Sequence, residues 1–515
     1  MLRVVSGSGV PVVLGLDVGT TSAKAVAYDA AGRDLGDGEA GYPLLEPEHG
    51  HAEQDPERVA DAALAALRDA ARAAREGGAE VAGVSVSTAM HGLVGLDGDG
   101  RPVTRLITWA DTRASREAER LRAEHGALHG RTGTPLHPMA PLPKLMWLRV
   151  HAPRAFGAAQ RWGGVKELVL ERLTGAWAVD RSCASGTGLL DLGRLDWDAE
   201  ALELAGVSAS QLAALVSTTD VFELRAEAAE RAGLSPGVPV VAGGGDGPLA
   251  NLGVGAVAPG VAACSIGTSG ALRLMVERPF VDPHGRIFCY ALVPGRWVVG
   301  GAVNNGGVVL QWAGEALAPE LDAERLLELA ADVPAGSEGL VMLPYLLSER
   351  APHWSPLPRG AYVGLTRHHG RAHLVRAALE GVCQQLALVL ASMRDAGSEV
   401  REIRATGGFA RSELWRRILA GALGMPVGFP HGHEGSAFGA ALVGMEALGL
   451  VESIEVAADL VRLEEVVEPD DDEAETYAAA LPVFAGLYDA LEPAFRSLQT
   501  LAAHEAPAAD PEDSG

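Results

Sequence analysis

The chain has 515 residues, of which 48% are hydrophobic, and a formal net charge of −25 at pH 7. This length exceeds what one core supports and fits two domains of roughly 200 to 250 residues. The negative charge argues against a nucleic-acid or membrane partner, because either would select a basic surface, and no stretch reaches the roughly 18 consecutive apolar residues of a membrane span.

Two further features predict a cytoplasmic location. Residues 1–11 read as a short leader that lacks the cationic start and long apolar centre of an export signal. The cysteines lie far apart and form no CxxC pattern, so we expect them to be reduced and buried. They are Cys183, Cys264, Cys289 and Cys383.

Residues 12–29 predict a β-hairpin with a polar tip. An apolar run ends at Asp17, the chain turns through Gly-Thr-Thr-Ser at residues 19–22, and a second apolar run returns. Such a tip suits a phosphate chain, because glycine lets the backbone approach closely while hydroxyl and amide groups donate to the phosphate oxygens. Asp17 is placed to hold the water shell of a magnesium ion.

The same pattern returns in the second half of the chain, where SIGTS at residues 265–269 matches DVGTT at residues 17–21. Two copies of one hairpin indicate two related domains. We expect a first domain over residues 12–257, a second over residues 258–498, and a disordered acidic tail over residues 499–515.

The element order of the first half predicts a mixed α/β domain. A strand at residues 36–42 follows the hairpin, an alanine-rich helix with apolar residues at helical spacing covers residues 56–76, and a strand covers residues 81–86. Residues 114–173 are predicted to be helical, with an interruption by the proline-rich segment 134–147.

The second half repeats this arrangement. Strands are expected there at residues 298–302, 339–344 and 402–405, and helices at residues 373–394 and 477–498, whereas a further strand expected at residues 237–245 ends the first half. The strand at residues 402–405 leads into Gly407-Gly408 and a helix start, which is a place where α/β sheets bind nucleotides.

Four motifs in this order resemble the FGGY family of carbohydrate kinases, within the superfamily of sugar kinases, actin and heat-shock chaperones. They are DVGTTSAK at residues 17–24, GGGD at residues 243–246, GTSG at residues 267–270 and the late Gly-Gly turn. The resemblance covers residues 12–498. It implies an α/β fold of two actin-like (ribonuclease H-like) domains that close on a cleft, with sugar held mainly by the first and ATP mainly by the second.

Other segments resemble the gluconate kinase branch of this family, namely residues 87–97, 107–113, 132–149, 300–307 and 349–354. Xylulose kinases share the Met90-His91 pair but usually carry an asparagine-rich form of the WADTR stretch. Glycerol kinases have Arg-Glu at this pair, which argues against glycerol as the substrate.

Phosphoryl transfer to a sugar hydroxyl needs a carboxylate that accepts the proton, a metal ion and donors for the moving group. The resemblance assigns the catalytic base to Asp246, which follows three glycines at a strand end. It assigns magnesium to Asp17, through water, and to Asp246. The alternatives are a helix-capping role for Asp246 and a turn-satisfied carboxylate at Asp17.

The resemblance also assigns the ATP contacts. The first hairpin holds the β- and γ-phosphates, the second hairpin approaches from the other side, and two later segments contact adenosine. These residues are Thr20, Thr21, Ser22 and Lys24, then Gly267, Thr268 and Ser269, then Gly307, Gln311, Gly408 and Ser412. Lys24 stands where relatives often have arginine, and lysine gives a point charge without a fork of donors. In the alternative, these residues are ordinary turn residues and exposed polar groups.

The predicted sugar-binding residues are Met90, His91, Trp109, Asp111, Arg113, Met139 and Asp246. His91 can donate to or accept from a sugar hydroxyl, and Arg113 is the nearest obvious partner for a carboxylate. Met139 has no polar group and is expected only to form part of the pocket wall. In the alternative, residues 109–113 form a structural loop. Arg350 is not assigned to the sugar pocket, and stabilising domain closure is an alternative role for it.

The expected reaction is ATP-dependent phosphorylation of D-gluconate at its 6-hydroxyl, giving 6-phosphogluconate and ADP. The expected partners are small molecules, a sugar acid and Mg-ATP, with a homodimer possible. Two alternatives stay open, a kinase for xylulose or another polyol, and an actin-like protein that binds nucleotide without catalysis.

Overall fold

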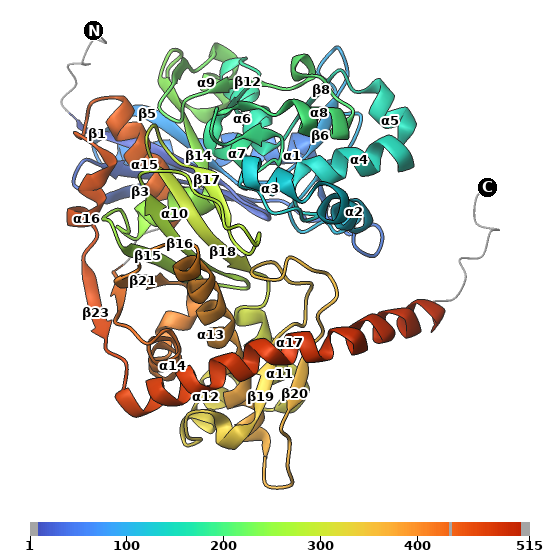
Figure 1. Ribbon diagram of the computed structural model, residues 1–515. Coiled ribbons are helices and arrows are strands. Elements are labelled where there is room, and N and C mark those ends of the chain that lie inside the picture. Colours follow the sequence, from blue (N-terminus) through green and yellow to red (C-terminus); the bar gives the residue numbers. More distant parts are fainter. Residues whose placement is uncertain (1–8, 432–434, 506–515) are drawn as a thin grey trace.

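The computed structural model describes residues 9–431 and 435–505, which fold around two separate sheets (Figure 1). The first sheet, in spatial order, contains β13 (Val221–Glu223), β14 (Pro239–Gly245), β5 (Ala79–Thr88), β1 (Val10–Val18), β2 (Ser22–Asp29) and β3 (Asp34–Gly41). The second contains β17 (Phe288–Ala291), β18 (Trp297–Val303), β16 (Gly270–Val276), β15 (Val261–Ile266), β21 (Glu402–Thr406), β22 (Val427–Pro430) and β23 (Leu463–Val467).

Short strands pair outside these sheets. They are β4 (Glu53–Gln54) with β7 (Leu106–Ile107), β6 (Val94–Leu96) with β8 (Arg161–Gly163), β9 (Ala178–Asp180) with β12 (Ala214–Val216), β10 (Leu190–Asp191) with β11 (Asp196–Trp197), and β19 (Val341–Leu343) with β20 (Ala361–Val363).

Helices cover both sheets. In the first half they are α1 (Pro56–Glu76), α2 (Ser115–His125), α3 (Ala127–Thr132), α4 (Pro141–His151), α5 (Pro153–Ala158), α6 (Val165–Thr174), α7 (Arg181–Ser185), α8 (Ala199–Ala205), α9 (Ala226–Ala232) and α10 (Asp246–Gly253). In the second half they are α11 (Gly307–Leu317), α12 (Ala323–Ala331), α13 (Arg371–Asp395), α14 (Glu413–Leu423), α15 (Gly435–Ala447), α16 (Ala457–Leu460) and α17 (Asp471–Glu505).

The two sheets share one topology, which confirms the internal repeat. In the first, β1 is antiparallel to β2, β2 is antiparallel to β3, and β5 and β14 join in parallel. In the second, β15 is antiparallel to β16, β16 is antiparallel to β18, and β21 and β22 join in parallel on the other side of β15. Asp17 and Ser265 thus occupy equivalent places, each in the strand that leads into a hairpin tip.

Helix α1 forms where its sequence predicts it. The Asp55 side chain accepts from the backbone N–H groups of Glu57 and Arg58, which would otherwise be unpaired at the helix start. The small alanine side chains of the helix and Gly38 of β3 let the two elements lie close together. A Cβ atom on Gly38 would be only 2.5 Å from the Ala66 carbonyl oxygen. One face of the first sheet is covered in this way.

Helix α15 crosses from the second half onto the other face of the first sheet (Figure 1). A Cβ atom on Gly15 in β1 would overlap the carbonyl oxygen of Ala437, and one on Gly439 would overlap that of Leu249 in α10. The backbones of α15, β1 and α10 therefore touch directly. This packing ties the second half of the chain to the helix that begins with Asp246.

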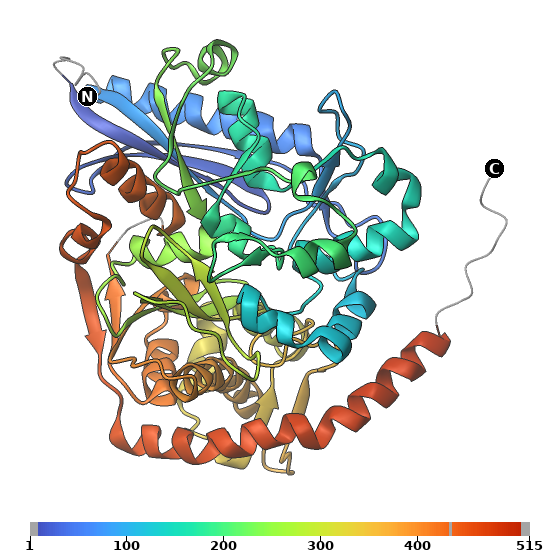
Figure 2. The same ribbon diagram turned by 45° about the horizontal axis from the view of Figure 1, so that its top comes forward.

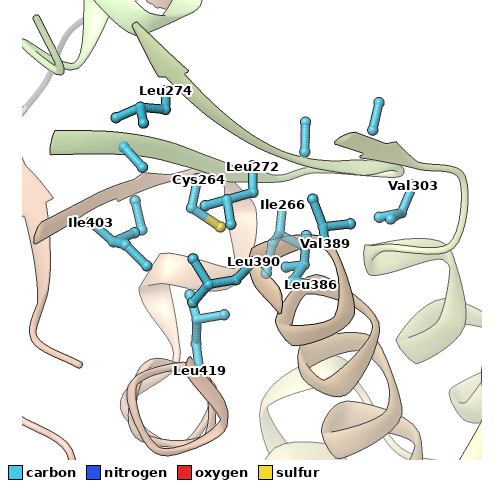
Figure 3. Packing of buried hydrophobic residues seen from close by; sticks show 14 of the residues in the cluster. Cys264, Ile266, Leu272, Leu274, Val303, Leu386, Val389, Leu390, Ile403 and Leu419 are labelled. Carbon is cyan, nitrogen blue, oxygen red and sulfur yellow. The ribbon is translucent and has the colours of Figure 1, made fainter. Parts of the chain in front are cut away.

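Helix α13 forms the centre of the second half (Figure 3). Leu386, Val389 and Leu390 on this helix pack against Cys264 and Ile266 of β15. Within residues 9–431 and 435–505, α13 alone has the length and apolar composition to cross a membrane, but 83% of its most apolar window is buried inside the protein. The four cysteines are free and buried, as predicted.

Three expected boundaries are wrong. Helix α4 starts at Pro141, inside the proline-rich segment, because proline at the first helical position loses no hydrogen bond. Strand β1 begins at Val10, inside the expected leader. Residues 499–505 continue helix α17, which runs along the second half and projects from it (Figures 1 and 2); residues 1–8 and 506–515 lie outside the described part.

Candidate active site between the two halves

Asp246 is held at the junction of β14 and α10. A Cβ atom on Gly243, which has φ of 67°, would overlap the Val86 carbonyl oxygen, so only glycine lets β14 approach β5 here. Asp246 Oδ1 accepts a hydrogen bond of 2.7 Å from the Gly247 backbone N–H. The glycine-rich strand end therefore fixes the carboxylate at the amino end of a helix.

Asp246 faces a cavity of about 200 Å³ between the two halves of the chain. Seven predicted site residues line it, namely Thr20, Met90, His91, Trp109, Met139, Asp246 and Ser269. Residues that the sequence analysis did not assign also line it, including Arg273, Phe288, Tyr290, Arg350 and Trp354. The cavity thus joins the tip of the first hairpin to the tip of the second.

The charges around this cavity are unequal. Among the described residues that line it, Asp246 is the only carboxylate, whereas Arg273 and Arg350 are both cationic. Burial raises the pKa of the Asp246 carboxyl, and the Gly247 N–H and the Arg273 guanidinium oppose that rise. Burial lowers the pKa of Arg350 to about 10, so its guanidinium stays charged at neutral pH.

His91 presents a hydrogen-bond acceptor to the cavity. Its Nδ1 lies 2.6 Å from the Gly186 carbonyl oxygen, which can only accept, so Nδ1 carries the proton. Burial lowers the pKa of His91 to about 3, and the ring is therefore neutral. Nε2 is left free to accept from a hydroxyl group, a role that suits a sugar.

Trp109 connects three parts of the site. Its Nε1 donates to Thr20 Oγ1 at 2.9 Å, on the tip of the first hairpin. The guanidinium carbon of Arg350, from the second half, lies 4.9 Å from the centre of the indole ring. The side chain thus couples the predicted phosphate-binding tip to the other half of the chain.

Asp111 and Arg113, which are predicted to bind the sugar, are not among the residues that line this cavity. Arg113 Nη2 donates to Asp111 Oδ2 at 2.7 Å and to Glu53 Oε1 at 2.6 Å. Asp111 also accepts from the Ala52 N–H, and it is 1% exposed. Two carboxylates already neutralise the Arg113 guanidinium, which leaves none of its charge for a ligand. These contacts favour the structural-loop alternative.

Lys144 joins the segments that line the cavity, and sequence reasoning missed it. Its Nζ donates to the carbonyl oxygens of His91, Thr108 and Met139, each at 2.7 Å. The side chain is completely buried, and burial lowers its pKa to about 7. The signal in the sequence that could have identified Lys144 is a single lysine within an apolar, proline-rich segment. Likewise, Arg273 is a lone charge in an apolar strand.

Asp17 lies at the base of the first hairpin, where its Oδ1 accepts from Ser87 Oγ at 2.6 Å. The described residues contain no group of three or more histidine, cysteine or acidic side chains that could hold a metal ion. A single carboxylate beside a predicted phosphate-binding tip fits magnesium, which keeps several waters and binds through substrate phosphates. The donor set is therefore compatible with a magnesium ion carried by a nucleotide.

The second hairpin tip meets the start of α11. The Gly307 N–H donates to the Gly267 carbonyl at 2.7 Å, and Gly306 donates to Thr268. Ser412 Oγ accepts from the Trp415 N–H and so caps α14, and Gln311 donates to Glu315. Gly408 lies in the 3-10 turn before α14. Nucleotide contacts of these residues, and of Thr21, Ser22 and Lys24, stay predictions.

Comparisons with known proteins agree with this architecture. Residues 12–253 match the N-terminal domain of the FGGY family of carbohydrate kinases, and residues 262–448 match its C-terminal domain. The chain belongs to this family. It is therefore a carbohydrate kinase with the two-domain fold of the sugar kinase and actin-like superfamily.

Its relatives in the FGGY family include two substrate classes. Gluconokinase from Bacillus subtilis (strain 168) is 39% identical over 93% of this chain and 96% of the relative. Xylulose kinase from the same strain is 30% identical over 92% of this chain and 96% of the relative.

Solved structures of FGGY kinases superpose closely. Gluconate kinase from Lactobacillus acidophilus has a TM-score of 0.90 at 34% identity and covers 95% of this chain and 99% of its own. Ligand-bound xylulose kinase from Lactobacillus acidophilus has a TM-score of 0.91 at 34% identity. The match covers 95% of this chain and 100% of that protein.

Proposed function

We propose that the chain transfers the γ-phosphoryl group of ATP to the 6-hydroxyl of D-gluconate, giving 6-phosphogluconate and ADP. The observation that carries this proposal is the cavity in which one carboxylate, Asp246, faces two arginines, Arg273 and Arg350. In a chain with a net charge of −25, such a local excess of positive charge suits an anionic sugar.

Asp246 acts as the general base in this proposal. Burial raises the pKa of the Asp246 carboxyl, and the Gly247 N–H and the Arg273 guanidinium oppose this rise, because a donor and a nearby positive charge favour the charged form. Asp246 then accepts the proton of the 6-hydroxyl as that oxygen attacks the γ-phosphorus in line. His91 Nε2 accepts from another sugar hydroxyl and fixes the orientation of the chain of hydroxyls.

The two hairpin tips hold the phosphates in this proposal. Thr20 and Ser269, which line one cavity, approach the transferred group from opposite sides. Asp17 would hold magnesium through water, and that ion, when bound, neutralises charge on the β- and γ-phosphates. Closure of the halves around Trp109 and Arg350 excludes water from the reacting group.

Xylulose is the second candidate substrate, because xylulose kinases match nearly the whole chain at about 30% identity. This alternative keeps Asp246, His91 and both hairpin tips, but it leaves the two cavity arginines without an anionic partner in the sugar. A neutral ketose also gives no reason for the higher identity to gluconokinases. We therefore place it second.

The test is an ADP-release assay with Mg-ATP and a panel of gluconate, xylulose, ribulose, glycerol and other sugar acids. A preference for gluconate of at least tenfold in kcat/KM is the expected result. Preference for a neutral ketose would overturn the substrate assignment. Absence of turnover with every member of the panel would contradict the proposal as a whole. Cytoplasmic location and dimerisation stay predictions.

A further inference from the structure

We propose that His137 and Arg350 bind the carboxylate of the sugar acid and select it over neutral sugars. This inference rests on the proposed function and deepens it, because it places the end of the substrate that lies away from Asp246. No carboxylate partner other than Arg113 followed from the sequence, and Arg113 is neutralised by Asp111 and Glu53.

His137 carries a buried donor without a partner. The side chain is 3% exposed, and its Nδ1 accepts from the Met139 backbone N–H at 3.2 Å. Since Nδ1 is the acceptor, the neutral ring carries its proton on Nε2. Nε2 is buried and has no hydrogen-bond partner in the described part of the chain. An unpaired buried donor is costly, which argues for a ligand group that accepts from it.

Arg350 carries a second donor of this kind. Its Nε is buried and finds no partner within the described residues, and its Nη2 donates only to the Val303 carbonyl oxygen at 3.1 Å. The face of the guanidinium lies on Trp109. Among the described side chains, no carboxylate forms a salt bridge with Arg350, so its charge is available to an anionic ligand.

The side chains of His137 and Arg350 line one cavity of about 570 Å³, together with Trp109, Ser269 and other residues. Trp109, Ser269 and Arg350 also line the smaller cavity that contains Asp246. A ligand bound at Arg350 can therefore reach Asp246 with its other end. Two exposed glutamates line the larger cavity as well, but their charges are solvated, whereas His137 and Arg350 are enclosed.

The surroundings of His137 favour an acceptor-only, negatively charged group. Burial lowers the pKa of His137 well below its usual range, and the charges of Arg350 and Arg122 lower it further. Within the described residues, Arg122 donates to the carbonyl oxygens of Leu136 and Trp354. A carboxylate accepts at both oxygens and donates from neither, so it matches two donors beside guanidinium groups that form no salt bridge in the described part of the chain.

The test compares His137→Asn with His137→Gln in the intact enzyme. Asparagine keeps an acceptor near Nδ1 for the Met139 N–H but removes the donor at the Nε2 position, whereas glutamine restores a donor there. For His137→Asn we expect the KM for gluconate to rise at least tenfold, with the KM for ATP changed less than twofold. For His137→Gln we expect the increase in log KM for gluconate to be at most half of the increase in His137→Asn.

D-Sorbitol, in which a hydroxymethyl group replaces the carboxylate of gluconate, isolates the charge contribution. For Arg350→Gln we expect kcat/KM for gluconate to fall at least 100-fold while kcat/KM for sorbitol falls much less. His129→Asn is the matched control, because His129 is also buried with an unpaired Nε2 but lines a different cavity. This control should leave the KM for gluconate within twofold of wild type.

The outcomes separate this inference from the proposed function. If the wild-type enzyme phosphorylates gluconate but both His137 variants keep its KM within twofold, the carboxylate site is wrong and the function stands. Equal losses for gluconate and sorbitol in Arg350→Gln would also contradict a role in carboxylate binding. If the wild-type enzyme acts only on neutral sugars, the proposed function itself is wrong.

Discussion

Asp246 combines two properties that oppose each other at the scale of a single residue. Burial raises its pKa, so the ionised carboxylate that a general base requires is the form that the folded protein disfavours. A group whose pKa is higher in the folded than in the unfolded state contributes stability at low pH, and this contribution is lost as the pH rises through the folded-state pKa. At neutral pH the charge on Asp246 therefore destabilises the fold.

Asp246→Asn should abolish catalysis and stabilise the protein. We expect turnover to fall by about 10²- to 10⁴-fold, the usual contribution of a general base, while ATP binding measured by calorimetry is largely retained. The unfolding temperature at pH 7 should rise, and the difference from wild type should disappear at acidic pH. Near-normal activity, or a lower unfolding temperature at pH 7, would contradict this assignment.

Lys144 holds three backbone carbonyl oxygens near the proposed sugar site, and its effect on the sugar is expected to pass through the backbone. Replacing it by methionine leaves the carbonyl oxygens of His91, Thr108 and Met139 buried without their donor. Each such loss costs about 1–3 kcal/mol, so we expect Lys144→Met to lose at least about 3 kcal/mol of unfolding free energy. The KM for the sugar should rise more than the KM for ATP, because all three carbonyls belong to segments of the proposed sugar site.

Denaturant unfolding and steady-state kinetics together check this role. Lys144→Arg keeps a cation with several donors and serves as the conservative variant, so it should recover part of the sugar affinity. Equal increases in both KM values would indicate general disruption of the fold, contrary to a positioning role.

At the scale of elements, the contact between α15 and α10 joins the second half of the chain to the helix that begins with Asp246, the proposed general base. A Cβ atom on Gly439 would overlap the Leu249 carbonyl oxygen, and Leu249 lies in the helix that Asp246 begins. Gly439→Ala should therefore shift α10. Overpacking of this kind costs about 1–3 kcal/mol, and we expect kcat to fall as well as stability.

Gly486→Ala provides the matched control for this contact. Gly486 lies exposed in α17, where a Cβ atom would meet nothing within 4 Å. Alanine should stabilise that helix by up to about 1 kcal/mol, without a change in kcat. Thermal unfolding and the ADP-release assay measure both effects. A Gly439→Ala enzyme as active and stable as wild type would show that the two helices do not need this close approach.

For the whole molecule, sequence reasoning recovered the features that depend on local pattern. Both hairpins, α1 and α13 follow from strand alternation and helical spacing, and Asp246 follows from its glycine motif. The motifs also indicated the two-domain fold. These signals are contained within short segments, which is why no structure was needed to find them.

Features that depend on contacts between distant segments were not predictable. The apolar sequence of α15 indicates burial, but nothing in it says that the helix covers the sheet of the other half. Glu53 neutralises Arg113 across a loop, which removed the expected carboxylate partner. His137 is noticeable only once its Nε2 is seen to be buried without a partner.

The link between the two halves through Trp109 leads to a prediction about domain closure. Trp109→Phe keeps an aromatic face for Arg350 but removes the hydrogen bond from Nε1 to Thr20. A hydrogen bond of this kind is worth about 0.5–1.5 kcal/mol. Because this bond holds the ring that Arg350 covers against the predicted phosphate-binding tip, we expect kcat/KM to fall about threefold to tenfold.

Small-angle scattering with and without saturating gluconate and ADP measures the closure itself. In wild type we expect the radius of gyration to decrease on ligand binding, and in Trp109→Phe we expect a smaller decrease. Trp177→Phe is the control, since Arg161 covers the Trp177 ring at 4.7 Å but both residues belong to the first half. If both variants close as wild type does, Trp109 positions the sugar without stabilising the closed state.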